Sequence, residues 1–175
     1  MVGCVSLSAR GWVAVGLLCW TAAVCGQAAD PSPQTPYTDR AVEQIRRLIP
    51  AIEAVRRAGI DLPITADTTR APVARAALDA GADAINDVAA GTEDAGILAL
   101  AAERGAGLIL MHRKAPPAAD RYADRYDAPP DYGPGPRAVV DAVRSFLYER
   151  LARAADAGVP ADRVVIDPGL GFGKS

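Results

Sequence analysis

The chain has few aromatic residues, a single histidine and no cysteine after residue 25. Half of its 175 residues are hydrophobic but only 5% are aromatic, so a core must be built mainly from Ala, Val, Leu and Ile. Cys4, Cys19 and Cys25 all lie near the N-terminus, and His112 is the only histidine. This inventory offers no recognisable zinc-ligand spacing, and it excludes a disulfide framework in the body of the chain.

An excess of positive charge is also missing. The formal net charge is -2 and the sequence pI is about 5.4, so no basic face is expected and nucleic acid is not an expected partner. Lys114 and Lys174 are the only lysines. The length of 175 residues suffices for one ordinary domain with a real core.

The N-terminal segment differs from the rest of the chain. Residues 1–29 form an apolar leader in which Arg10 precedes an apolar run that ends in small residues. This pattern is typical of a signal peptide, although a non-native start gives the same pattern. The run is too short to predict a membrane span, and a membrane partner is not expected. We expect a cytoplasmic protein, with secretion as the alternative.

Residues 30–39 are rich in Pro, Ser, Thr and Gln and indicate a linker, and residues 40–175 form the expected domain. Within this domain, helical periodicity alternates with short apolar segments. The expected helices are 41–55, 73–80, 91–105 and 139–158, and the expected strands are 62–66, 82–85, 107–111 and 163–166. Strands that alternate with helices at this spacing predict a parallel α/β sheet.

Local signals refine the expected helices. Pro50 predicts a kink or break in the first helix, and Thr68 or Thr69 can cap the second, with Pro72 in its first turn. Glu93 and Asp94 are expected in the first turn of the third helix, where the helix dipole favours acidic side chains.

Each expected strand ends in a polar residue: Asp67, Asn86, His112 and Asp167. In a (β/α)8 barrel such ends converge on one face, where the chemistry takes place. A doubly wound open sheet also gathers them at a crevice, so the pattern leaves both architectures open. Taken singly, Asp67 can be a helix cap, Asn86-Asp87 can form a turn through side-chain to backbone hydrogen bonds, and His112 can be a structural residue. The functional signal is the shared position of the strand ends.

The last twelve residues resemble a phosphate-binding loop but do not form one. In the sequence Val164-Val-Ile-Asp-Pro-Gly-Leu-Gly-Phe-Gly-Lys-Ser175, Pro168 stands where a P-loop needs its first glycine. The carboxylate of Asp167 would also repel a phosphate placed over the strand end. It can instead accept hydrogen bonds from paired N–H groups, such as those of a ring amide or an amino-heterocycle.

Four ordered blocks of sequence resemble dihydropteroate synthase. They are Ile64-Thr-Ala-Asp-Thr-Thr-Arg70, Val73-Ala-Arg-Ala-Ala-Leu-Asp-Ala-Gly-Ala-Asp-Ala-Ile-Asn-Asp-Val88, Leu110-Met-His112 and Ile166-Asp-Pro-Gly-Leu-Gly-Phe-Gly-Lys174, and together they cover about residues 40 to 175. The resemblance implies a TIM-barrel enzyme of folate biosynthesis. Such an enzyme joins 4-aminobenzoate to (7,8-dihydropterin-6-yl)methyl diphosphate and releases diphosphate with the help of Mg2+.

The resemblance also implies roles for individual residues. Asp67, Asn86 and Asp167 would bind the pterin, Met111 would pack against its ring, and Phe172 would border the 4-aminobenzoate site. Carboxylates suit this task because they accept from the amino and ring N–H groups of a pterin, and an amide both donates and accepts.

The last of the four resembling blocks contains three glycines and a lysine: Gly169, Gly171, Gly173 and Lys174. The glycines would let the backbone pass close to two flat substrates. No catalytic residue and no metal ligand is assigned. Ala89-Ala90 stands where Ser-Gly is usual in the family, and Arg113-Lys114 after the histidine is a further departure.

Blocks that the family carries before and after this region have no counterpart, including the first strand that helps to bind metal and diphosphate. We therefore expect an incomplete TIM barrel of about four parallel strands with flanking helices, and impaired or no activity for this chain by itself. Its free edges predict aggregation, pairing with another chain or poor folding, and a homodimer stays open. Two alternative functions also stay open: a methyltetrahydrofolate-type methyltransferase domain, and a non-catalytic secreted binding protein.

Overall fold

The structure, a computed structural model, describes residues 39–115 and 130–174. The chain divides into two units, Met1–Thr35 and Pro36–Ser175, and every described residue belongs to the second. The predicted leader, and the predicted linker up to residue 38, lie outside the described residues.

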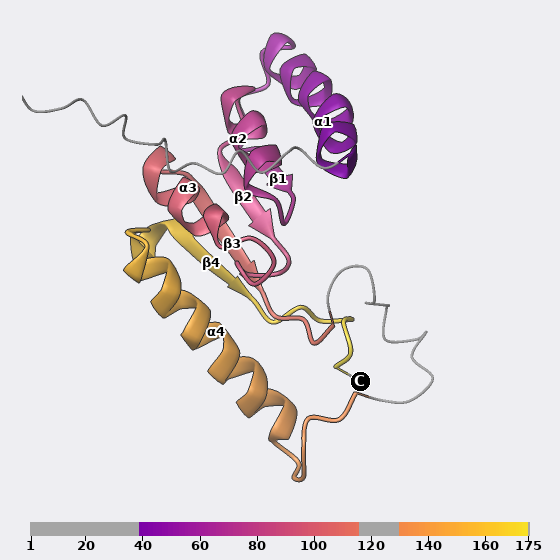
Figure 1. The fold of residues 1–175 in the computed structure, drawn as a ribbon, viewed down its shortest axis with the longest axis vertical. Coiled ribbons are helices and arrows are strands. Elements are labelled where there is room, and N and C mark those ends of the chain that lie inside the picture. The colour runs from indigo at the N-terminus through magenta and orange to yellow at the C-terminus, as the bar shows by residue number, and fades with distance from the viewer. Residues whose placement is uncertain (1–38, 116–129, 175) are drawn as a thin grey trace, which may run out of the picture. The chain divides into compact units, whose positions relative to one another are not determined.

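Four strands alternate with four helices and form one parallel sheet (Figure 1). In chain order the elements are α1 (Asp39–Arg57), β1 (Thr65–Asp67), α2 (Ala71–Asp79), β2 (Ala84–Asp87), α3 (Gly96–Arg104), β3 (Gly107–Met111), α4 (Ala138–Asp156) and β4 (Val164–Asp167), with a 3-10 turn at Ala161–Arg163 before β4.

The strands lie side by side in their sequence order, β1-β2-β3-β4. Parallel crossovers are right-handed, so a sheet that grows in one direction receives all its crossover helices on the same face. A doubly wound sheet reverses direction at its switch point and carries helices on both faces. The strand order therefore favours the barrel over the open sheet, and Figure 1 shows α2, α3 and α4 following one another along the sheet.

The core lies between this sheet face and the helices. Successive strand residues point to opposite faces, and the strands supply Ile85, Leu108 and Leu110 to the helix-covered face, where they are buried. The same core cluster includes Ile97 from α3 and Ala154 from α4. Small and aliphatic side chains thus build the core, as the composition predicts.

Helix α1 packs against α2 through an apolar stripe, with Ile52 buried and Leu48 and Ile49 half-buried beside it. Arg56, in the last turn of α1, adds a polar anchor. Its guanidinium donates hydrogen bonds to the carbonyl oxygens of Gly81, Ile60 and Leu62, and it forms an ion pair of 2.6 Å with Asp83.

Three predictions about helix ends and continuity need correction. Helix α1 continues through Pro50, so the predicted break is wrong. The N-cap of α2 is Arg70 rather than Thr68 or Thr69, although Pro72 does lie in the first turn as predicted. Helix α3 begins at Gly96, so Glu93 and Asp94 precede it.

One acidic side chain explains both of the misplaced helix starts. Asp94 accepts hydrogen bonds from the backbone N–H of Ala71 at 2.8 Å and from that of Gly96 at 3.0 Å. It therefore serves the first turns of α2 and α3 together, and a partner 23 residues away replaces the expected local threonine cap of α2.

Among the helices of the described residues, none is long and apolar enough to cross a bilayer.

Candidate functional site

The register of the sheet places the four predicted pterin residues on one face. Asp67 pairs with Asn86 across β1 and β2, and Met111 pairs with Asp167 across β3 and β4. Asn86 pairs in turn with Ile109, two residues before Met111, so both pairs point to the same side of the sheet. This side is the one opposite the buried Ile85.

These side chains lie at the carboxyl ends of their strands and form two successive rows. Asp67, Asn86 and Ile109 belong to the first row, and Met111 and Asp167 to the second. Asp67 is exposed, Asn86 and Asp167 are half-buried, and Met111 is only 4% exposed. The face therefore combines hydrogen-bonding groups that a ligand can reach with one apolar side chain.

The carboxylate of Asp167 also orders the loop that follows β4. One of its oxygens accepts the backbone N–H of Gly169 at 2.7 Å. No described residue donates a hydrogen bond to its second oxygen, Oδ2. One oxygen thus holds the loop while the other is available for a ligand.

Gly169 is required by both conformation and space. Its φ is +66°, in the left-handed region, and a Cβ at this position would lie 2.2 Å from the carbonyl oxygen of His112. No side chain fits at that distance. The loop consequently lies directly against the end of β3, next to Met111.

Lys174 fixes the far end of the same loop. Its ammonium group donates to the carbonyl oxygens of His112 at 3.0 Å, Gly169 at 2.8 Å and Phe172 at 3.0 Å. Three donors on one ammonium match three carbonyls, so Lys174 joins the β4 loop to the β3 end rather than acting as an ordinary surface charge. In the sequence, the only signal for this role of Lys174 is its position directly after the glycine-rich stretch.

His112 is 5% exposed and its ring meets the ring of Phe146 edge-on, with centroids 5.0 Å apart. No described residue forms a hydrogen bond with Nδ1 of His112. Burial lowers the pKa of His112 below its usual 6.5, and the nearby positive charge of Lys174 lowers it further. The imidazole is thus held neutral under the glycine loop. This is the structural role that the sequence left open as the alternative to a functional one.

Asp87 is a structural acid next to the site, and it forms the side-chain to backbone turn that the sequence allowed for Asn86-Asp87. Its carboxylate is fully buried and accepts the backbone N–H groups of Ala89 at 2.9 Å and Gly91 at 2.6 Å. Burial raises the pKa of Asp87, against the effect of these two hydrogen bonds. The turn that it organises holds Ala90 at φ +50°, a conformation that suits the glycine usual at that position in the resembling family.

A hollow of about 330 Å³ lies between this turn and the exit of β3, and Arg113, Lys114 and Glu93 contribute the charged part of its walls. Arg113 also approaches Phe172, with its guanidinium carbon 6.0 Å from the ring centroid. Phe172 therefore lies close to a cation, as a residue bordering a carboxylate-bearing substrate would. Its role at a 4-aminobenzoate site stays a prediction.

Among the described residues, no three or more His, Cys, Asp or Glu side chains gather in a way that could hold a metal ion. The carboxylates of Asp67 and Asp167 stand on the two outer strands, with β2 and β3 between them. They do not fit a shared Mg2+ site.

The family model described as pterin binding enzyme matches residues 24–175. The chain belongs to this family. A probable bifunctional folylpolyglutamate synthase/dihydropteroate synthase of Haloferax volcanii is 46% identical over 87% of this chain and 16% of its own length. The dihydropteroate synthase of Synechocystis is 37% identical over 86% of this chain and 47% of its own length.

Solved structures of other pterin binding enzymes share the fold. The dihydropteroate synthase of Stenotrophomonas maltophilia gives a TM-score of 0.66 at 38% identity, over 77% of this chain and 46% of that one. The Xanthomonas albilineans dihydropteroate synthase in complex with 7,8-dihydropteroate gives 0.60 at 39% identity, over 77% and 45%. The present pterin binding enzyme chain is an incomplete TIM barrel, and it spans at most about half the length of these relatives.

Proposed function

We propose that this chain carries the pterin-binding part of a dihydropteroate synthase. The observation that carries the proposal is the common face of Asp67, Asn86, Met111 and Asp167 at the carboxyl ends of neighbouring strands. The similarity to dihydropteroate synthases, one of them solved with 7,8-dihydropteroate, supports the same substrate class.

Each of these side chains has a distinct task in this proposal. The free oxygen of Asp167 accepts an N–H of the pterin, and Asp67 accepts a second at the other end of the face. The amide of Asn86 both donates and accepts along the ring edge, and the thioether of Met111 packs against the ring. Together these contacts would orient the pterin ring on this face of the sheet.

The proposed reaction is a substitution at that methylene carbon. The amine of 4-aminobenzoate forms the new C–N bond while the C–O bond to diphosphate breaks, and the amine loses a proton. Stabilising the leaving diphosphate is the main electrostatic demand. Mg2+ would supply that stabilisation, but the described residues do not form its site. This chain's residues therefore bind and orient, and no metal-dependent step is placed on them.

The test is calorimetric titration with a pterin diphosphate analogue, comparing the unchanged chain with Asp167→Asn. Asparagine keeps the oxygen that accepts the Gly169 N–H, but it replaces the second oxygen with an N–H donor that faces the donors of the pterin. We expect affinity to fall by about 100-fold, because a hydrogen bond to a charged acceptor is lost and two donors oppose each other.

Asp162→Asn is the matched control, since Asp162 is exposed and lies outside the sheet face. Equal affinities for the two variants would remove Asp167 from the site. Binding of a methyltetrahydrofolate with no effect of 4-aminobenzoate would favour the methyltransferase alternative.

A cytoplasmic location belongs to this proposal and rests on the family resemblance alone.

A further inference from the structure

The loop that follows β4 runs from Pro168 to Lys174 and contains three glycines, each at positive φ. Glycine restricts the backbone less than any other residue, so such a loop does not hold one conformation by itself. Its polar contacts include a hydrogen bond from the N–H of Phe172 to the carbonyl oxygen of Gly169 at 3.1 Å and the three hydrogen bonds of the Lys174 ammonium. The conformation of the loop therefore depends on a few polar contacts.

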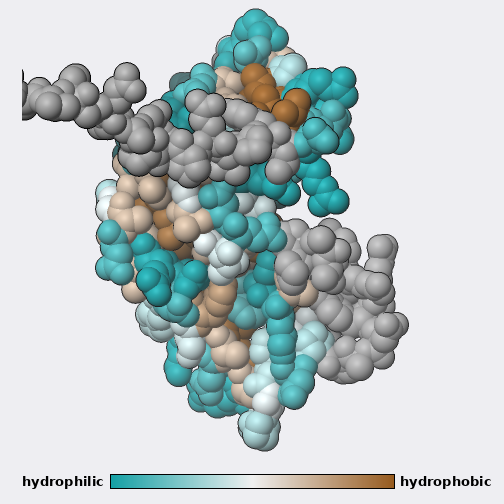
Figure 2. Space-filling view, viewed as in Figure 1, coloured by the Kyte–Doolittle hydropathy of each residue, from teal (hydrophilic) through white to brown (hydrophobic). Residues whose placement is uncertain are grey.

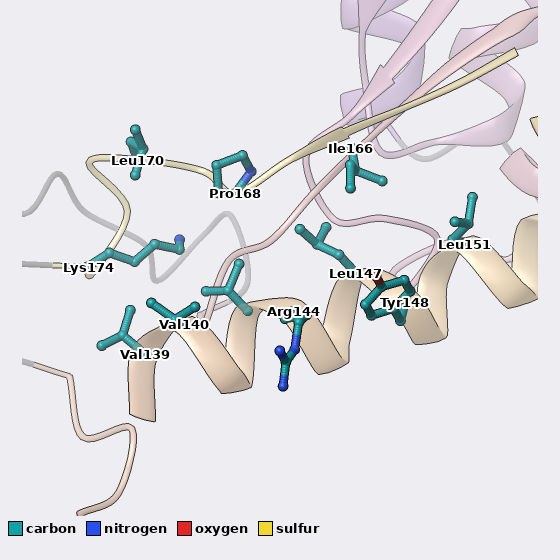
Figure 3. A pocket seen from close by; sticks show the side chains of 11 residues that line it. Val139, Val140, Arg144, Leu147, Tyr148, Leu151, Ile166, Pro168, Leu170 and Lys174 are labelled. Carbon is teal, nitrogen blue, oxygen red and sulfur yellow. The ribbon is translucent and has the colours of Figure 1, made fainter. Parts of the chain in front are cut away.

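The ammonium of Lys174 joins both ends of this loop to the end of β3. Its acceptors are the carbonyl oxygens of Gly169 at the start of the loop, Phe172 near its end, and His112 directly after β3. In Figure 3, the side chain of Lys174 runs back beneath the loop toward Pro168. One ammonium thus connects three separate points of the backbone.

The two sides of the loop differ in polarity. Leu170 points away from the Lys174 side chain, is 78% exposed and borders an apolar groove of about 570 Å³ beside α4 (Figure 3). Figure 2 shows the apolar surface between α4 and the loop. On the other side, a Cβ at Gly169 would meet the side chain of Met111 at 3.1 Å and Nζ of Lys174 at 3.2 Å. The hydrogen bonds of Lys174 therefore lie on the side of the candidate site.

Gly169 connects the ammonium of Lys174 to the carboxylate of Asp167. Its carbonyl oxygen accepts from Lys174 at 2.8 Å, and its N–H donates to Oδ1 of Asp167 at 2.7 Å. The ammonium and the carboxylate thus hold the same residue through its two backbone polar groups. While Gly169 stays in place, Oδ1 of Asp167 is engaged and the orientation of Oδ2 is set.

We propose that Lys174 is a positioning residue for the pterin: by holding Gly169, it fixes the orientation in which Asp167 presents its second oxygen to the ligand. This inference rests on the proposed function, because it concerns the same pterin site. Lys174 acts without touching the ligand, since its three N–H donors already have carbonyl acceptors. Without the ammonium, Gly169 loses an anchor, and the carboxylate turns among orientations of which only some suit a pterin N–H.

The test is calorimetric titration of the full chain and of Lys174→Met with 6-hydroxymethylpterin. This probe carries no diphosphate, so a lost positive charge does not weaken its binding through long-range attraction. Methionine keeps an unbranched apolar stem but has no N–H donor. We expect affinity to fall by about tenfold, because the ligand must then order a side chain that the free chain no longer holds in place.

Arg163→Met is the matched control. Arg163 also joins the β4 segment to a distant backbone carbonyl, that of Gly105 at 3.1 Å, but it does so directly before the strand, at the end opposite Asp167. The control removes the same charge and a similar hydrogen bond, and it should leave the pterin affinity unchanged. Equal losses in Arg163→Met and Lys174→Met would show a general effect on the sheet and overturn the positioning role.

A double-mutant cycle separates positioning from a general loss of stability. Lys174→Met is combined with Asp167→Asn and, separately, with Asp67→Asn at the other end of the face. If Lys174 acts through Asp167, adding Lys174→Met to Asp167→Asn should weaken binding by less than about twofold, whereas the losses with Asp67→Asn should multiply. A full tenfold loss in both backgrounds would contradict the proposal.

Circular dichroism must show the same helix content in every variant. If Lys174→Met does not fold, Lys174→Arg takes its place: it keeps the charge, but its donors are spread over a planar fork and cannot converge from one atom on three carbonyls. We expect a loss of about threefold for Lys174→Arg, and full affinity would refute the three-carbonyl geometry.

The outcomes distinguish this inference from the proposed function. No binding of the pterin to the unchanged chain would refute the proposed pterin site, and this inference with it. Binding that is weakened by Asp167→Asn but unaffected by Lys174→Met would refute the role of Lys174 alone.

Discussion

Replacing Gly169 by alanine tests how tightly the glycine loop is held against β3. At φ +66° an L-residue costs about 1–2 kcal/mol, and the lower entropy of alanine in the unfolded chain offsets about 0.5–1 kcal/mol of this. The new Cβ would meet the carbonyl oxygen of His112 at 2.2 Å. That oxygen is backbone and cannot rotate away, so the loop must shift, at about 1–3 kcal/mol.

We therefore expect Gly169→Ala to lower the free energy of unfolding by about 2–4 kcal/mol, measured by urea titration with an unchanged m-value. Gly171→Ala is the matched control. Gly171 has φ +91°, but a Cβ there would meet nothing within 4 Å, so only the backbone penalty of about 1 kcal/mol applies. Equal losses in the two variants would refute the close approach of the loop to His112.

Three further predictions concern the surrounding structure. The pKa of His112 is lowered on folding, so the unfolded chain binds more protons just below pH 6.5. The free energy of unfolding should therefore fall as the pH decreases through 6.5. Urea titrations between about pH 7.5 and 5.5 check this, and in His112→Gln this part of the pH dependence should disappear. Arg56→Ala should cost about 2 kcal/mol and speed hydrogen exchange in α1, whereas Arg57→Ala, an exposed neighbour, should cost less than about 0.5 kcal/mol. Asp87→Ala should cost about 2–4 kcal/mol in the same urea titration, since it leaves two backbone N–H groups without their acceptor; a loss below about 1 kcal/mol would contradict the role of this carboxylate.

The sequence predicts the strand ends well because the alternation of helices and strands is regular. Asp67 and Asp167 end β1 and β4 as expected, and Gly105 closes α3 in the left-handed conformation. Parallel strands bring such ends to one edge of the sheet. The shared face of Asp67, Asn86 and Asp167 could therefore be predicted from the strand ends, whereas Met111 was expected there only from the family resemblance. His112, the fourth expected strand end, instead packs edge-on against Phe146 and is buried.

The features that the sequence did not predict depend on contacts between distant residues. Asp94 replaces the local cap of α2 from 23 residues away, and Lys174 reaches the His112 carbonyl across 62 residues. Helix propensities contain no signal for such long-range partners.

Pterin binding at the strand ends can be tested by NMR titration of the isotopically labelled chain with a pterin diphosphate analogue. We expect saturable amide shifts at Asp67, Asn86 and Gly169, and unchanged amides for Ala154 on the opposite side of the sheet. Shifts confined to the groove beside α4, or no saturable shifts from a folded sample, would contradict a pterin site at the strand ends.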